Sequence, residues 1–245
     1  MLGVAAMSAS AKEKAPLSSS TQLIVVTTPG WDSVDGHMQR YERATVRDAW
    51  QPVGDAFAIV VGKHGLGWGA GVTPIATPTS TGPMKKEGDG KSPAGVFQLG
   101  TAFGDAATAL DGTKLKYIEL TPSIECVDDV NSEHYNRLVD RAKIASVDWK
   151  SSEHMRDTGE AYRLGIVVDH NGIAGPATQP PVRGGGSCIF LHLWQGPGHG
   201  TAGCTAMAPA NMEMLLRWLD PSRRPLLVQL TADEYARAKK TLKLP

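Results

Sequence analysis

The chain has 245 residues, of which 41% are apolar and 20% charged, a composition ordinary for a globular protein. Its 25 basic and 25 acidic residues cancel, and no unbroken run of Lys or Arg exceeds two residues, so the charge pattern gives no support to binding of nucleic acid or an anionic membrane. No apolar run approaches the roughly 18 residues that a membrane-spanning helix needs, so no membrane span is expected.

The first twenty residues are rich in Ala, Ser and Lys and are expected to form a tail. Their first eleven, MLGVAAMSASA, end in Ala9-Ser10-Ala11 ahead of Lys12. This end resembles the cleavage region of a secretory signal that lacks its basic start. A disordered N-terminus of low complexity is the alternative interpretation.

Short β-branched or apolar runs bounded by Gly, Pro or Asp predict strands along the rest of the chain. The runs expected to form strands are residues 22–28, 57–62, 115–120, 162–169, 188–194 and 225–230. Glycines at 65, 67, 69 and 71 are typical of turns that join short strands.

Helical periodicity is confined to the last forty residues or so. Met212, Leu215, Leu216 and Leu219 repeat at helical spacing behind Pro209, which suits a first helical turn. A second helix is expected after Thr231, with Glu234 three residues on as a capping box. With no internal repeat and no linker between separate apolar segments, we expect one mostly β domain with few helices over residues 21–245.

The chain contains three cysteines, Cys126, Cys188 and Cys204. In an oxidising compartment three cysteines allow one disulfide and one free thiol. The pairing that we expect is Cys126 with Cys188, which leaves Cys204 free. The polar run that follows Cys126, from Asp128 to Asn136, is expected to be an exposed loop.

Two glycine patterns resemble nucleotide-binding loops but lack essential features. The first pattern is Gly88-Asp89-Gly90-Lys91-Ser92, which ends like a phosphate-binding loop. However, Lys85 occupies the position of the first Gly of such a loop, and Pro93 does not suit the helix that must follow it. The glycines between 65 and 71 lack the spacing and the downstream helix of a dinucleotide fingerprint. Nucleotide binding is therefore not expected.

The stretch from Phe190 to Met207, FLHLWQGPGHGTAGCTAM, places His192 on an apolar run and Cys204 twelve residues later, after a Gly-rich loop. A thiol with a well-placed imidazole can carry out acyl transfer. Gly203 leaves room beside the thiol for a carbonyl substrate, and the loop offers backbone amides to an oxyanion. Such a nucleophile is expected to titrate below the value of a free thiol.

Two other interpretations compete with catalysis. If residues 188–194 alternate as a strand, Phe190, His192 and Trp194 share one face, and His192 is then simply a core histidine. A metal site would recruit His192, His199 and Cys204, but their spacing fits no common zinc signature. We expect no metal and no cofactor.

The order of His before Cys resembles the catalytic motif of the L,D-transpeptidases, the YkuD-like family of peptidoglycan enzymes. The motif runs here as His192 followed by Thr201-Ala202-Gly203-Cys204-Thr205-Ala206. An upstream segment, KEGDGKSPAGVF from Lys86 to Phe97, is similar to a second motif of the family, about a hundred residues before the first and in the family's order. Together the two motifs cover roughly residues 57–230. Ala202 and Ala206 depart from the pattern, because the family often has His and Arg or Asn at these positions.

The resemblance implies a mostly β catalytic fold of the YkuD type, described as a β-sandwich or barrel-like. It implies that Cys204 is the nucleophile and His192 the base, that the amides of Gly203 and Cys204 hold the oxyanion, and that the Thr201 hydroxyl lines the site. The substrate would be the stem peptide of peptidoglycan. Either a crosslinking amine or water would then accept the acyl group, and a catalytically silent peptidoglycan-binding module is a third possibility.

Four further residues are weaker candidates for binding the stem peptide. Trp194 and His199 lie on the loop between base and nucleophile, where they would wall the cleft. His170 and Asn171 end the preceding predicted strand and are expected to point toward the stem peptide. The resemblance further implies secretion across the inner membrane, to the periplasm or cell envelope. The oligomeric state stays open.

Overall fold

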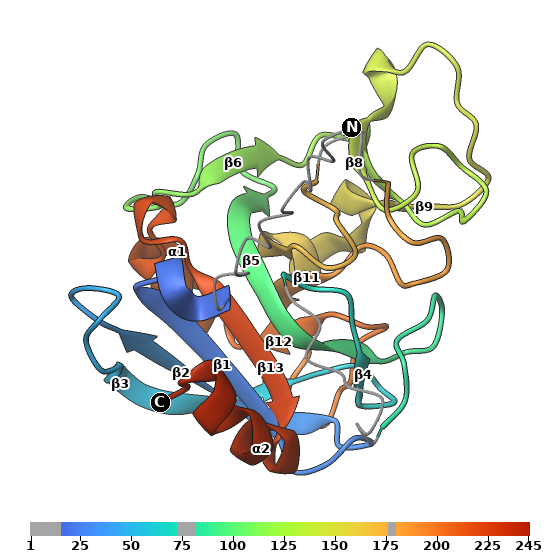
Figure 1. Ribbon diagram of the computed structural model, residues 1–245. Helices are drawn as coiled ribbons and strands as arrows, with labels where there is room; N and C mark the ends of the chain where they lie inside the picture. The colour runs from blue at the N-terminus through green and yellow to red at the C-terminus, as the bar shows by residue number, and fades with distance from the viewer. Residues whose placement is uncertain (1–15, 73–81, 176–179) are drawn as a thin grey trace, which may run out of the picture.

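The computed structural model describes residues 16–72, 82–175 and 180–245, and most of its regular structure is strand (Figure 1). The mostly β fold expected from the sequence is confirmed. The signal-like segment that ends at Ala11 lies outside the described residues. The chain is already folded within the predicted tail, because Leu17 is buried in the main core. No helix among the described residues is long and apolar enough to cross a membrane.

Most of the elements are short strands, with a few helices between them. The strands are β1 (Gln22–Thr28), β2 (Asp35–Glu42), β3 (Gln51–Val60), β4 (Leu66–Trp68), β5 (Ser92–Gly104), β6 (Lys116–Glu119), β7 (Ile124–Val127), β8 (Leu138–Asp140), β9 (Ser152–His154), β10 (Leu164–Val168), β11 (Phe190–Leu193), β12 (Thr205–Met207) and β13 (Leu226–Thr231). The helices are α1 (Pro209–Trp218), α2 (Ala232–Leu242) and the 3₁₀ segments η1 (Pro16–Ser19), η2 (Arg141–Lys143), η3 (Met155–Tyr162) and η4 (Pro221–Arg223).

Strand β5 closes the main sheet on itself. The sheet has ten strands among the described residues, in the order β10-β11-β12-β3-β2-β1-β13-β5-β4 with β6 beside β5. The first half of β5 pairs with β13 through residues 95–98, and its second half pairs with β10 through residues 99–104. Because β10 is also the first strand of the order, this second pairing makes the sheet barrel-like.

The helices cover the barrel at two places and follow the sequence signals. Helix α1 packs against β10 and β11, and α2 packs against β13 and β1 (Figure 1). The buried residues of α1 include Met212, Leu215 and Leu216, as its periodicity predicted. The N-terminus of α2 is capped by the Thr231 side chain, which accepts a hydrogen bond from the Glu234 amide at 3.2 Å.

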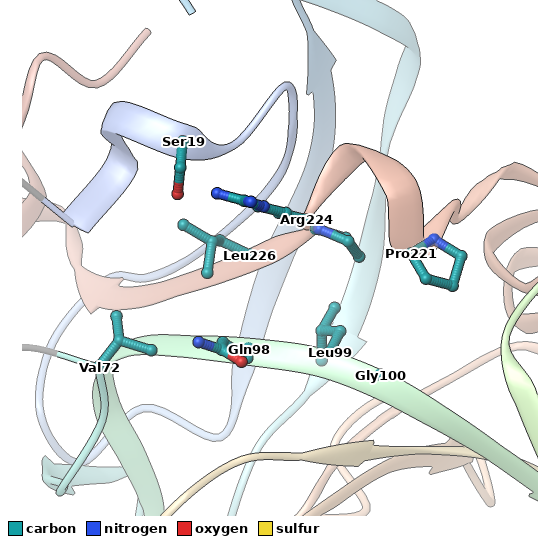
Figure 2. Close-up of a pocket in the computed structure, with 9 residues that line it drawn as sticks. Ser19, Val72, Gln98, Leu99, Gly100, Pro221, Arg224 and Leu226 are labelled. Atoms are coloured by element: carbon teal, nitrogen blue, oxygen red, sulfur yellow. The ribbon is translucent and has the colours of Figure 1, made fainter.

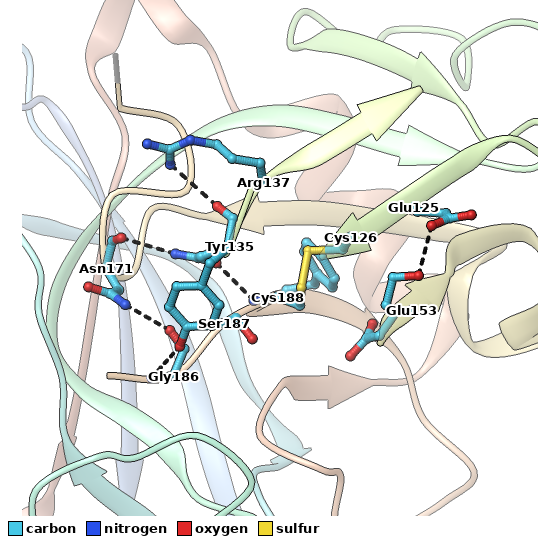
Figure 3. Close-up of a disulfide and its surroundings, with 12 residues drawn as sticks. Glu125, Cys126, Tyr135, Arg137, Glu153, Asn171, Gly186, Ser187 and Cys188 are labelled. Atoms are coloured by element: carbon cyan, nitrogen blue, oxygen red, sulfur yellow. Dashed lines mark hydrogen bonds between the residues drawn. A yellow bond between two sulfur atoms is a disulfide. The ribbon is translucent and has the colours of Figure 1, made fainter. Parts of the chain in front are cut away.

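A small separate sheet, here called the cap sheet, consists of β7, β8 and β9 in the order β8-β7-β9. The disulfide between Cys126 of β7 and Cys188, just before β11, joins it to the barrel (Figure 3). This pairing and the free thiol of Cys204 are the ones that the sequence predicted, and both are confirmed. The cap sheet is therefore covalently fixed next to the strand that carries His192.

The polar run after Cys126 is not the exposed loop that the sequence predicted, because Tyr135 and Asn136 are buried. The Asn136 side chain accepts a hydrogen bond from the Cys188 amide at 3.0 Å and donates to the carbonyl oxygens of His170 and Asn171. Its backbone has φ of 55°, a left-handed conformation that Asn tolerates better than most residues. Asn136 thus supplements the disulfide in attaching the cap sheet to the barrel.

We predict that reduction of the disulfide will destabilise the whole fold. The disulfide closes a loop of 62 residues. By lowering the conformational entropy of the unfolded chain, a crosslink of this span raises the free energy of unfolding by about 4 kcal/mol. The measurement is urea unfolding with and without a phosphine reductant. A Cys126→Ser/Cys188→Ser variant serves as the control, since its stability should be low and insensitive to the reductant. Equal stability of the oxidised and reduced wild-type chains would contradict the prediction.

Candidate active site

Parallel pairing of β11 with β12 brings the predicted base and nucleophile together. His192 is opposite Ala206 in the register, so Cys204, two residues earlier, lies beside Phe190. Residues two apart on a strand face the same side. The imidazole and the thiol therefore share one face of the sheet, separated along the strands by one pleat repeat.

The thiol of Cys204 is buried, with 6% of the residue exposed, and lies among backbone groups. Its Sγ accepts a hydrogen bond from the Phe190 amide at 3.3 Å and lies 3.5 Å from the Cys188 carbonyl oxygen. Burial, together with the negative charge of Glu153, raises the pKa of the thiol to about 12. This contradicts the sequence-based expectation of a thiol that titrates below the free value.

His192 is also held in its neutral form. Its Nδ1 lies 2.8 Å from the carbonyl oxygen of Leu193, so Nδ1 carries the proton and Nε2 is left as the acceptor. The ring packs edge-on against Tyr162, with ring centroids 5.2 Å apart. Burial lowers the pKa of His192 below its ordinary value. The resting pair is thus a neutral imidazole and a neutral thiol, not an imidazolium and a thiolate.

The segment from Thr201 to Cys204 is organised by the Thr201 hydroxyl. This hydroxyl donates to the carbonyl oxygen of Cys204 at 2.6 Å and accepts from the Gly203 amide at 3.1 Å. The Gly203 amide is therefore already engaged, which leaves the Cys204 amide as the better of the two predicted oxyanion donors. Thr201 lines the neighbouring cavity, as expected, and at the same time holds the peptide of the nucleophile in place.

The upstream motif lies directly beneath the nucleophile. The buried Ser92 hydroxyl donates to the carbonyl oxygen of Cys204 at 2.8 Å and accepts from the Gly62 amide at 2.8 Å. A Cβ at Gly62 would lie 2.3 Å from the Gly90 carbonyl oxygen, so only Gly permits this close approach of the chains. The two motifs that are a hundred residues apart in sequence therefore share one hydrogen-bonded contact.

A cavity of about 220 Å³ opens over the thiol. Its walls include Cys204, His192 and Gly203, the three residues predicted to be catalytic. They also include residues that sequence reasoning did not assign to the site, namely Lys85, Glu87, Asp128, Glu153 and Tyr162. Lys85 directly precedes the upstream motif, and this position in the sequence was a signal for assigning it to the site. Glu153 and Tyr162 belong to no motif.

A second cavity of about 350 Å³ adjoins the first. Trp194, His199 and Thr201, three predicted substrate-binding residues, are among the residues that line it. Glu153, Tyr162, His192 and Ala202 line both cavities. Together the two cavities form a cleft, and the substitutions Ala202 and Ala206 that depart from the family pattern lie on its wall.

His170 and Asn171 do not face this cleft, and this placement corrects the sequence-based expectation. His170 is fully buried, with Nε2 3.0 Å from the Gly185 carbonyl oxygen, and burial lowers its pKa to about 4. The Asn171 side chain donates to the carbonyl oxygens of Val182 and Gly186 at 2.9 and 3.0 Å. Both residues hold the loop that precedes Cys188, so their role is structural.

Another pocket, of about 440 Å³, lies elsewhere, between β5 and the segment before β13 (Figure 2). Figure 2 shows Ser19 and Arg224 on one wall and Gln98 and Leu99 on the other. Among the residues that the structure describes, no thiol, imidazole or carboxylate lines it. Within the described ranges, no group of three or more His, Cys, Asp or Glu side chains is arranged to hold a metal ion.

Residues 56–228 match the family model of the YkuD L,D-transpeptidase catalytic domain. The match covers both motifs, the closing strand β5, the cap sheet and the cleft. No curated protein and no solved structure gave a significant match to the chain. The family resemblance stated on the two motifs is thereby confirmed.

We predict that Cys204, the free thiol, will react slowly with iodoacetamide at neutral pH. A pKa of about 12 leaves so little thiolate that labelling should be on the order of 100-fold slower than in the urea-unfolded chain, even after allowing for the greater nucleophilicity of a basic thiolate. The labelling rate should keep rising above pH 9. A rate that levels off below pH 8.5 would indicate a thiolate–imidazolium pair instead.

We predict that Ser92→Ala will destabilise the fold by about 1–3 kcal/mol, because the buried Gly62 amide loses its acceptor. The measurement is the free energy of unfolding in urea. Ser222→Ala is the matched control: Ser222 is exposed, and its loss should change the stability by less than about 0.5 kcal/mol. Equal effects of the two substitutions would show that the shared contact of the two motifs is not a stabilising one.

Proposed function

The chain belongs to the L,D-transpeptidase catalytic domain family, and on this premise we propose that it catalyses cysteine-dependent acyl transfer on peptidoglycan stem peptides. Family membership implies a transpeptidase-type activity on peptidoglycan. The finer proposal assigns Cys204 as the nucleophile and His192 as the base. The observation that carries it is the register of β11 and β12, which puts both side chains on one face at the floor of a cleft.

The first half of the reaction follows from the neutral state of the pair. Nε2 of His192 takes the thiol proton as Sγ of Cys204 attacks the carbonyl carbon between the diamino acid and the D-Ala of a tetrapeptide stem. The Cys204 amide donates to the oxyanion that forms. The C–N bond then breaks, His192 returns the proton to the leaving amine of D-Ala, and a thioester remains on Cys204.

The proton transfer accompanies the attack, because the thiol is not ionised beforehand. A neutral imidazole is ready to accept a proton, and its lowered pKa keeps it neutral down to pH values below the ordinary His range. The acidic limb of activity should therefore lie below about pH 6.5, the ordinary pKa of His. Thiolate character develops only when the substrate carbonyl is in place.

In the second half of the reaction an acceptor attacks the thioester. An amine of another stem gives a crosslink, a free D-amino acid gives exchange, and water gives a carboxypeptidase. The same cleft serves all three outcomes, so a hydrolase of the same fold is the second candidate. The buried thiol favours a third candidate, a peptidoglycan-binding module without catalysis.

We also propose that the protein works outside the cytoplasm, in the periplasm or cell envelope. The support is the Cys126–Cys188 disulfide, because structural disulfides persist in oxidising compartments and are rare in the cytosol. The stem peptides of the assembled cell wall are found in the same compartment.

We predict that the wild-type chain will remove D-Ala from tetrapeptide-stem muropeptides and, with excess free D-amino acid, exchange the terminal residue. The measurement is mass spectrometry of the muropeptides after incubation. Cys204→Ala and His192→Ala should each abolish both products, because one lacks the nucleophile and the other the base. His37→Ala is the matched control, since His37 is exposed on β2 and lines neither cavity.

Each result separates the candidates. Exchange or dimer formation that depends on Cys204 supports the transpeptidase, and D-Ala loss without exchange supports the carboxypeptidase. Unchanged muropeptides in every sample would contradict both enzyme proposals. Activity that persists in Cys204→Ala would overturn the assignment of the nucleophile.

A further inference from the structure

Glu153 and Tyr162 meet over the nucleophile although neither belongs to a family motif. The Tyr162 hydroxyl donates to Oε2 of Glu153 at 2.7 Å. Tyr162 also lines the cavity over Cys204 and lowers the pKa of the thiol, which partly offsets the effect of burial. The Tyr162 ring also contacts the His192 ring. One tyrosine therefore links a carboxyl group to both proposed catalytic residues.

The position of Glu153 is fixed by the cap sheet. It lies directly opposite Cys126 in the pairing of β7 with β9, and Cys126 is bonded to Cys188 (Figure 3). The disulfide thus fixes the strand of Glu153 against the barrel next to the nucleophile. The carboxyl group is held rigidly at the cleft, as the placement of a catalytic group requires.

Glu153 stands at the boundary between the two cavities. It lines both of them, as do Tyr162 and His192. A molecule that passes from the larger cavity to an acyl group on Cys204 moves along Glu153, Tyr162 and His192, which line both cavities. This is the path that a second substrate would take once the first occupies the thiol cavity.

Glu87, another acidic group of the thiol cavity, differs from Glu153 in its partners. Glu87 accepts hydrogen bonds from Tyr135 and Ser187 at 2.5 and 2.7 Å. Lys85, a cation on the same cavity wall, is paired with Asp89 at 2.6 Å. Glu153 receives only the Tyr162 hydroxyl among the described residues, so its Oε1 remains available to a ligand. With Asp128 also on the wall, the cavity favours a cationic group.

The proton balance of the second half-reaction calls for a second base when the acceptor is an amine. An ammonium ion has three N–H bonds and the amide product has one, so two protons leave the nitrogen as the C–N bond forms and the C–S bond breaks. His192 passes one of them to the departing sulfur and regenerates the thiol. The other proton needs a second acceptor. Water as the nucleophile loses only one proton in the same step.

Resting on the function proposed above, we propose that Glu153 is this second base: it binds the primary ammonium of the acceptor as a carboxylate and takes one of its two protons. Tyr162 acts as a positioning residue that fixes the carboxylate. Glu153 therefore serves aminolysis of the thioester and is not required for hydrolysis. The chain thus contains separate bases for the thiol and for the acceptor amine.

The charge state of Glu153 gives this role a pH dependence. Burial raises the pKa of Glu153 to about 7, with Asp128 and Glu87 adding to the effect and the Tyr162 hydroxyl opposing it. His192 and Cys204, the other titratable groups that face it, are both neutral at this pH, and Lys85 is neutralised by Asp89. The carboxylate form is present above this pKa. The ratio of exchange to hydrolysis should therefore rise as the pH is raised through about 7.

The test compares products of the full chain on tetrapeptide muropeptides with a saturating free D-amino acid, resolved by mass spectrometry. In Glu153→Gln the ratio of exchange to hydrolysis should fall about 100-fold, the lower end of the range of general-base contributions. The matched control is Glu160→Gln, because Glu160 is exposed on η3, the segment that directly follows β9, and its side chain pairs with Arg163. Its ratio should equal that of the wild type.

A second variant keeps the test decisive if Glu153→Gln does not fold. Tyr162→Phe removes the donor that lowers the pKa of Glu153, so the pH at which the exchange ratio rises should move upward, a shift that loss of packing alone does not produce. The role of Glu153 would be overturned by an unchanged ratio of exchange to hydrolysis in Glu153→Gln, or by an unshifted pH midpoint of that ratio in Tyr162→Phe. In either case, release of D-Ala would still support the proposed function. A wild-type chain that releases no D-Ala would overturn the proposed function itself.

Discussion

The carbonyl oxygen of Cys204 is the point at which the separate parts of the catalytic region meet. It accepts hydrogen bonds from the Ser92 hydroxyl at the start of β5 and from the Thr201 hydroxyl in the Gly-rich loop. Ser92 also accepts from Gly62 after β3, so three chain segments are locked to one peptide group. Because a buried polar group must keep its partners, the orientation of the nucleophile depends on this contact. Through Ser92, the upstream motif therefore acts on the backbone of Cys204.

This rigid backbone contact goes with a proposed nucleophile that is unreactive at rest. The thiol is surrounded by protein, its pKa is raised, and the imidazole next to it is neutral. A cysteine of this kind resists oxidation and adventitious acylation, since both reactions need exposed thiolate. Reactivity then arises from the alignment of substrate, base and thiol in the cleft. With the proposed function, this dependence on a bound substrate makes Cys204 selective for a substrate that fits the cleft.

Local sequence predicted those parts of the fold whose signal is itself local. Strand β1 is a continuous β-branched run, α1 and α2 carry an apolar stripe and a Thr cap, and the His and Cys motif located the floor of the cleft. The sequence does not predict strand β2, DGHMQRYE, because most of its residues are polar or charged. It does not predict β5 either, because Pro93, Gly95 and Gly100 are residues typical of turns. The side chains at His170 and Asn171 were misplaced because the end of a strand does not reveal which loop will cover it. Glu153 and Tyr162 reach the site only through the disulfide and the cap sheet, and no short pattern encodes such a contact.

The cap sheet has one further consequence, which concerns how such a protein can change over generations. Its three strands pair only with one another among the described residues, and its place on the barrel is set by a disulfide and by side-chain contacts such as those of Asn136. Insertions or deletions within it leave the register of the ten-stranded sheet untouched. The barrel with its nucleophile can therefore be inherited unchanged while the segment that supplies Glu153 diverges, as long as the two cysteines are retained as a pair. With the roles proposed for Glu153 and Cys204, acceptor choice and bond-breaking chemistry then evolve on separate parts of one chain.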